Sequence, residues 1–133
     1  MIKPQAHIRV DFSGTCSIGP GKISLLEGIE RTGSLSAAAR ALGMSYRRGW
    51  LLLHSVNEGF SQPVAELSVG GKDGGGAKLT EFGLSLVADY RAFEAAVDSL
   101  AVKTFAGVRV SSKASDVTSP RRPVTRSLGT KKK

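Results

Sequence analysis

Four consecutive residues near the middle of the chain, Ser45-Tyr46-Arg47-Arg48, combine hydroxyl and guanidinium groups at the predicted start of a helix. Ser45 can cap that helix, because its side-chain oxygen can accept a hydrogen bond from a free backbone N–H of the first turn. Arginine can pair in bidentate fashion with guanine or hold phosphates, and Tyr46 and Ser45 can donate to phosphate. This chemistry predicts contact with a nucleic acid. A second interpretation stays open for Tyr46, namely a partly buried ring that packs against Trp50.

The elements that must position these residues are two short helices joined by a tight turn, over residues 33–57. Ser34 is expected to cap the first helix, and Gly43 to form the turn, where glycine adopts a left-handed conformation at the least cost. In the second helix Trp50 shares a face with Leu53, so Trp50 is the expected core anchor. This layout is typical of a helix-turn-helix whose second helix enters the DNA major groove. The apolar stripe of the first helix comprises Leu35, Ala38, Ala39 and Leu42.

Charge is distributed unevenly along the chain. The net charge of +8 at pH 7 comes from residues 103–133, which carry nine Lys or Arg against the single acid Asp116, while residues 1–102 balance ten basic residues with ten acids. Between Glu30 and Glu58 there is no acid. A surface of one sign is what contact with an anion needs, although arginines on helices are also often only solvated. The basic residues of this interval are Arg31, Arg40, Arg47 and Arg48.

Patterns on either side of the two helices predict the elements that frame them. Alternation over His7–Phe12 predicts a half-buried strand. Residues 14–21 are expected to form a loop. Residues 22–31 are expected to form a helix that buries Ile23, Leu26 and Ile29 and ends at Gly33. Val64–Val69 and a return strand that begins at Lys78 flank a glycine-rich tip, which predicts a β-hairpin wing after the helix-turn-helix.

A long helix follows the wing, capped by Thr80 and reaching about Leu100. Apolar residues in it follow a 4-3-4-3 spacing, which is the seam of a coiled-coil pair. Such a seam can also pack on its own domain, but we favour a dimer contact, because most other apolar residues are already assigned to the core. The seam residues are Leu86, Tyr90, Phe93, Val97 and Leu100.

Together these patterns predict a mainly α fold with a small β-sheet, a winged helix-turn-helix followed by a long C-terminal dimerisation helix. The domain covers residues 1–102, with the dimerisation helix at about 80–102, and residues 103–133 form a basic tail that we expect to be disordered. No apolar run is long enough to span a membrane, no apolar signal segment occurs, and Cys16 has no partner for an internal disulfide. We therefore expect a cytoplasmic protein without a membrane partner.

The chemistry typical of enzymes is missing from these patterns. Gly71–Gly76 has the glycine interval of a phosphate-binding P-loop, but Ala77 and Lys78 follow where Lys and then Ser or Thr are required. His7 and His54 lie far apart in the sequence and suggest neither a zinc site nor a nucleophile pair. We predict that the chain is not an enzyme and has no catalytic or metal-binding residues.

Five short pieces of the chain, taken together, resemble one family. They are Leu25-Leu26-Glu27-Gly28-Ile29, Gly33-Ser34 with Ala38-Ala39, Ser45-Tyr46-Arg47 with Trp50, Gly70-Gly71-Lys72 with Gly74-Gly75-Gly76-Ala77, and Leu79-Thr80 with Gly83. Through them the chain resembles the N-terminal winged-helix DNA-binding domain of ModE-type molybdate-responsive transcription regulators, relatives of the LysR-type helix-turn-helix. The resemblance covers roughly residues 6–100.

The resemblance implies a homodimer that binds double-stranded DNA at a palindromic operator. The third helix would read base edges and the wing would contact the flanking backbone. At the matching positions, Ser45, Tyr46, Arg47 and Lys72 would contact DNA. From charge and position we add Arg40 and Arg48, and the remaining candidates are Ser34 and Lys78.

The chain departs from the family's pattern in two respects. Family members that sense molybdate carry C-terminal oxyanion-binding domains, whereas only about thirty basic, aperiodic residues follow Leu100. We therefore expect no cofactor in this chain. Molybdate is suggested by the resemblance alone, and the domains that would bind it are not expected here. Leu51 and Leu52 stand where more polar residues are expected on a reading helix. They are either buried against the domain or shift the sequence that is read by touching thymine methyl groups.

Two alternatives stay open. The helix-turn-helix could be a protein-interaction adaptor, with the basic tail binding an acidic partner or, nonspecifically, a nucleic acid. The charge balance of residues 1–102 keeps this interpretation open. The chain could also sense an oxyanion at a pocket that the sequence does not reveal.

Overall fold

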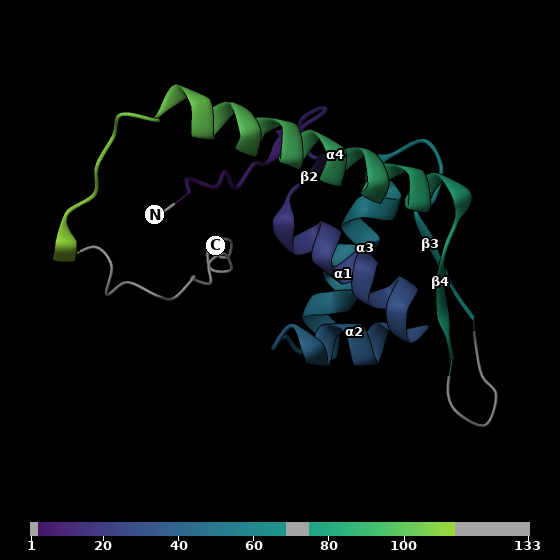
Figure 1. The fold of residues 1–133 in the computed structure, drawn as a ribbon. Coiled ribbons are helices and arrows are strands. Elements are labelled where there is room, and N and C mark those ends of the chain that lie inside the picture. Colours follow the sequence, from purple (N-terminus) through teal and green to yellow (C-terminus); the bar gives the residue numbers. More distant parts are fainter. Residues whose placement is uncertain (1–2, 69–74, 114–133) are drawn as a thin grey trace.

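A computed structural model describes residues 3–68 and 75–113, and within them the chain forms four helices and four short strands (Figure 1). In chain order these are β1 (Val10–Asp11), β2 (Ser17–Ile18), α1 (Pro20–Thr32), α2 (Leu35–Ala41), α3 (Tyr46–Gly59), β3 (Ala65–Leu67), β4 (Ala77–Leu79) and α4 (Glu81–Thr104). The predicted mainly α fold with little β-structure is confirmed. The strands form two antiparallel pairs, β1 with β2 and β3 with β4. In this part of the chain no helix is both long and apolar enough to cross a membrane.

Aliphatic side chains from all the helices meet around α1. This helix lies in the middle of the fold, with α2 below it and α4 crossing above it in the view of Figure 1. The predicted burial of Ile23, Leu26 and Ile29 is confirmed, and each is at most 1% exposed. Leu35 of α2 and Leu53 of α3 join the same cluster. Burial of such side chains is the main source of stability, at about 1.5–3 kcal/mol for each.

Small residues bring α1, α2 and α3 into close contact. A Cβ built on Gly28 of α1 would lie 2.9 Å from the Cβ of Ala38 in α2. A Cβ built on Gly49 of α3 would lie 3.0 Å from the Cβ of Ala39. Because the backbones approach so closely at Gly49, this side of α3 must face α2. The contact therefore sets the rotation of α3 about its own axis.

The predicted turns and helix caps are confirmed. Gly33 and Gly43 both have φ of 73°, the left-handed conformation that glycine adopts most easily. The side-chain oxygens of Ser34, Ser45 and Thr80 each accept a hydrogen bond from the first turn of a helix, at 3.0, 3.1 and 2.9 Å. These local signals define where α2, α3 and α4 begin.

The β3–β4 hairpin is tied at its base to the helix-turn-helix. The side-chain oxygen of Asn57 at the end of α3 accepts from the backbone N–H groups of Val64 and Ala65, at 2.7 and 3.3 Å. The Asn57 amide nitrogen donates to the carbonyl of Ala65 at 3.1 Å. On the other strand, the N–H of Ala77 donates to the carbonyl of Gly33 at 2.9 Å. Both strands of the hairpin are therefore positioned by the helices.

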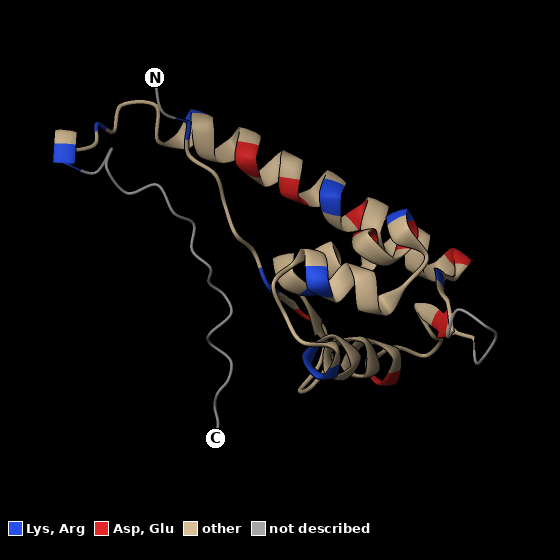
Figure 2. Ribbon diagram, turned by 90° about the horizontal axis from the view of Figure 1, so that it is seen from below, with Lys and Arg blue, Asp and Glu red and all other residues tan. Residues whose placement is uncertain are grey.

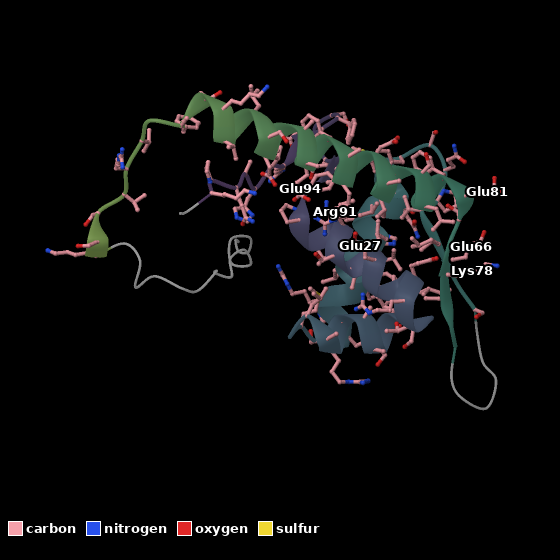
Figure 3. The ribbon with its side chains drawn as sticks, in the orientation of Figure 1. Glu27, Glu66, Lys78, Glu81, Arg91 and Glu94 are labelled. Carbon is pink, nitrogen blue, oxygen red and sulfur yellow. The ribbon has the colours of Figure 1, made fainter. Side chains whose placement is uncertain are left out.

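α4 is held against α1 by a charged contact. The Arg91 guanidinium donates to both carboxylate oxygens of Glu27, at 2.9 and 2.8 Å, and also to Glu94 (Figure 3). The hydrogen bonds from Arg91 hold the pKa of Glu27 below its ordinary value. The same contact with Glu27 raises the pKa of Arg91. Both side chains are about one-third exposed, so water weakens the pair.

Three predicted boundaries were wrong. The expected loop over residues 14–21 contains β2 and the start of α1 at Pro20, since proline is well suited to the first turn of a helix. Of the strand predicted over His7–Phe12, only β1 pairs. The segment before β1 instead lies along α4, where the Tyr90 hydroxyl donates to the carbonyl of Ile8 at 2.7 Å. The helix predicted to reach about Leu100 continues as α4 to Thr104.

Candidate nucleic-acid interface

The predicted contact residues that lie around the turn between α2 and α3 are Arg40, Ser45, Tyr46, Arg47 and Arg48. In this turn the N–H of Met44 donates to the carbonyl of Ala39 at 3.0 Å, and Ser45 then starts α3. α3 begins on the side of the fold away from α4, and the described part of the β3–β4 hairpin extends from α4 toward that same side (Figure 1). The start of α3 and the hairpin thus lie on one side of the molecule.

α3 carries a row of exposed side chains along its outer face. Arg47, Leu51 and His54 follow one another at intervals of four and three residues, so they lie on one stripe of the helix, and all three are exposed. Tyr46 and Trp50 border this stripe, with 53% and 39% of their surfaces exposed. We call these five residues the outer face of α3.

The prediction that Trp50 anchors the core was wrong. Its indole is exposed on the outer face of α3 and stacks on the His54 ring, with centroids 4.8 Å apart and planes 9° apart. The inward positions of α3 are occupied by Gly49, Leu53 and Val56. Tyr46, Trp50 and His54 recur every four residues, and that spacing was the signal for this row in the sequence.

Basic side chains near the α2–α3 turn have no acidic partner among the described residues. The ion pairs within residues 3–68 and 75–113 involve Arg9 and Arg91. Arg40 and Arg47 are exposed and Arg48 is half-buried. Figure 2, seen from the α2 side, shows blue on α2 and α3, while red recurs along α4. The positive charges of these arginines are therefore available to an anion.

The capping serines keep a hydrogen-bond donor for such an anion. The Ser45 oxygen accepts from the N–H of Arg48, which leaves its own O–H free to donate. Ser45 is exposed, and it begins a helix whose N-terminus favours negative charge. Ser34 has the same capping role at α2 but is half-buried. Ser45 is therefore better placed than Ser34 for a contact with phosphate.

Of the two contact residues predicted on the wing, Lys78 lies within the described residues and Lys72 does not. Lys78 is exposed on β4 and lies opposite Glu66 in the register of the hairpin (Figure 3). The neighbouring carboxylate offsets part of its charge. Lys72 lies outside the described residues, as does most of the predicted glycine-rich tip.

The residues of the predicted seam of α4 differ in how far they are exposed. Tyr90 is 2% exposed and packs within its own chain, so it is not part of a free surface. Leu86 and Val97 are half-buried. Phe93 and Leu100 are 46% and 60% exposed. The apolar surface that α4 offers to a partner is therefore concentrated in its second half.

An open groove of about 330 Å³ lies between α1, β4 and α4. Its charged lining mixes Arg31 and Arg91 with Glu27 and Glu30. Because Arg91 is paired with Glu27, this lining has no excess of positive charge that would favour an oxyanion. No group of three or more His, Cys, Asp or Glu in the described part of the chain is arranged to hold a metal ion.

Comparison with known proteins finds relatives that match between about half and two-thirds of the chain. The chain is 46% identical over 83 residues to the molybdenum-pterin-binding protein MopB of Rhodobacter capsulatus, which covers 62% of this chain and 31% of MopB. It is 37% identical over 92 residues to MopA of the same organism, or 69% of this chain and 35% of MopA. It is 39% identical over 71 residues to the DNA-binding transcriptional dual regulator ModE of Escherichia coli K12, or 53% of this chain and 27% of ModE.

These matches support the resemblance to ModE-type proteins. The chain spans about a third of the length of the curated relatives that it matches. No model of a protein family matches the chain.

Proposed function

We propose that this chain is a sequence-specific DNA-binding transcription regulator, which places α3 in the major groove and its β3–β4 wing on the flanking backbone. The observation that carries the proposal is the outer face of α3, where Arg47 is exposed and has no acidic partner in the described part of the chain. The similarity to a relative named as a DNA-binding transcriptional regulator supports it.

In this proposal the first turn of α3 makes the polar contacts. Arg47 reads a base edge, for which a bidentate pair with guanine is the commonest arginine contact. Ser45, Tyr46 and Arg48 hold phosphates and fix the register of the helix. Arg40, at the end of α2, and Ser34, Lys72 and Lys78 add contacts to the backbone. Helix N-termini are favourable sites for such anions.

We propose further that the protein binds a palindromic operator as a homodimer through the second half of α4. The exposed Phe93 and Leu100, together with Val97, provide the apolar surface. Two-fold symmetry would place the two α3 helices about 34 Å apart, or at a multiple of this distance, along one side of the DNA.

The test is selection of DNA from a random pool by the full chain, followed by a salt titration of the enriched sequence. We expect a palindromic sequence that binds at least ~10³-fold more tightly than random DNA, as is usual for specific binding. If no sequence is enriched, the proposal is wrong.

A second candidate function rests on the charge distribution. Because residues 1–102 have no net charge and residues 103–133 carry the whole excess, the helix-turn-helix could be a protein-interaction adaptor with a nucleic-acid-binding tail. Replacing the six basic residues from Arg121 to Lys133 by glutamine in the full chain separates the two functions. A regulator keeps its preference for the selected sequence, with a shallower salt dependence. An adaptor loses all binding to DNA.

Molybdenum appears in the names of the relatives MopA and MopB, so molybdate is the effector to test first. Calorimetry with molybdate and tungstate should be accompanied by melting curves of the protein. No heat and no shift in Tm would exclude direct sensing by this chain.

A further inference from the structure

We infer that Leu51 is a specificity-determining residue, which recognises the 5-methyl group of a thymine in each half of the operator. The inference rests on the proposed function and deepens it, because it names what the apolar part of the outer face of α3 reads. Leu52, the other leucine that is unusual on a reading helix, is half-buried against the core cluster and is not part of this surface.

The position of Leu51 follows from the packing of α3. Gly49 and Leu53 face inward, and Leu51 between them points away from the domain with 48% of its surface exposed. It lies one helical turn after Arg47 on the same stripe. A side chain that lies one turn further along the helix than a base-reading arginine faces the same groove.

The Trp50–His54 pair gives Leu51 a rigid neighbour. The two rings stack nearly parallel at 4.8 Å, which restrains two large side chains beside Leu51 on the outer face. The stacked rings of Trp50 and His54 and the exposed side chain of Leu51 together form a shallow, largely apolar surface. The arginines at the start of α3 would draw this surface toward the polyanion, because no acid lies between Glu30 and Glu58.

Thymine is the base that this surface suits. In the major groove thymine is marked by its 5-methyl group, and apolar side chains contact that group. The leucine cannot form hydrogen bonds to the edges of other bases, so a methyl group is the feature that it can recognise. Burial of one methyl group corresponds to about fourfold in affinity, or about fifteenfold for a symmetric pair in two half-sites.

The experiment uses the full chain and the sequence enriched by selection. Each symmetric pair of thymines is replaced in turn by deoxyuridine, which removes only the 5-methyl group, and the Kd is measured by fluorescence anisotropy. The same series is measured with Leu51→Ala and with Leu84→Ala. Leu84 is a matched control, since it is a similarly exposed leucine, at 44%, on α4. Circular dichroism confirms that both variants are folded.

For the unchanged protein and for Leu84→Ala we expect one thymine pair at which deoxyuridine weakens binding about fifteenfold. Leu51→Ala should weaken binding to the thymine sequence by a similar factor and show no further loss with deoxyuridine. The inference is overturned if an enriched sequence exists but no thymine pair is sensitive, or if Leu51→Ala keeps the full sensitivity. Failure to enrich any sequence would instead overturn the proposed function, and this inference with it.

Discussion

Arg47 is the residue with which the proposed DNA contact can be tested most directly. It is exposed in the first turn of α3, and its guanidinium takes part in none of the ion pairs of the described residues. If it reads a base, Arg47→Ala should weaken binding to the selected sequence by about 1–3 kcal/mol and relax the preference at one base pair. The measurement is a Kd for the selected sequence and for each single-base variant of it.

A contact to phosphate predicts a different result for the same variant. The loss would then be uniform across sequences, and the slope of log K against log salt would be shallower by about one unit. Arg109→Ala is the matched control, because it removes one exposed positive charge beyond the end of α4. If Arg47→Ala has the same affinity as Arg109→Ala for the selected sequence, and also for random DNA, Arg47 is not in the interface.

At the scale of elements, the joint between the hairpin and α4 depends on Gly83. A Cβ at this position would overlap the carbonyl oxygen of Val64, which is part of the backbone and cannot rotate away as a side chain can. Gly83→Ala should therefore destabilise the fold by about 1–3 kcal/mol or more, as overpacking does. Urea unfolding followed by circular dichroism measures the change.

Gly21 is the matched control for that variant. It also lies in the first turn of a helix, but a Cβ there would have nothing within 4 Å. Gly21→Ala should stabilise the protein by about 0.5–1 kcal/mol, since alanine favours the helix. Equal effects of the two substitutions would contradict the close approach of α4 to Val64.

The contact between α1 and α4 should make stability depend on pH. Arg91 lowers the pKa of Glu27 in the folded state. The charged pair therefore stabilises the protein at pH values above 4.5, the ordinary pKa of a glutamate side chain. This contribution is lost as the pH falls through the lower, folded-state pKa. Glu27→Gln should therefore lower the stability at pH 7, by less than about 1 kcal/mol because both groups are partly exposed.

Thermal melting of both proteins between pH 3 and pH 7 measures this effect. The difference in Tm between the unchanged protein and Glu27→Gln should shrink below pH 4.5. A difference that stays constant over the whole range would show that Glu27 acts by packing and not by its charge.

For the whole molecule, the proposed dimer depends on the second half of α4. Phe93 and Leu100 are exposed there, whereas Tyr90 is occupied by the N-terminal segment of its own chain. Sedimentation equilibrium should give twice the 14.0 kDa mass of one chain. Leu100→Ser should shift the equilibrium toward the monomer, because burial of a leucine contributes about 1.5–3 kcal/mol.

Leu84→Ser is the control for the dimer, since Leu84 is exposed at the other end of α4 and lies outside the seam. It should leave the mass unchanged. A monomer in the unchanged protein would rule out this homodimer, and the two half-sites of a palindrome would then have to be bound independently.

What the sequence by itself determined about this protein follows from rules that act over a few residues. The sequence predicted the capping roles of Ser34, Ser45 and Thr80, the helix end at Gly33 and the left-handed turn at Gly43, because a cap or turn depends on atoms within one helical turn. The same reasoning placed the hydroxyl and guanidinium groups at the start of α3. Local chemistry therefore defined the candidate interface and most of the helices.

The tertiary structure alone decided which faces of α3 and α4 are free. Trp50 is large and aromatic, as many core residues are, but the close contact of Gly49 with Ala39 turns its side chain outward. Tyr90 has the spacing of a dimer seam, but a segment more than eighty residues earlier in the chain covers it. Burial depends on which distant segment packs against a helix. The spacing of apolar residues shows that a helix has an apolar stripe, but it does not show which segment covers that stripe.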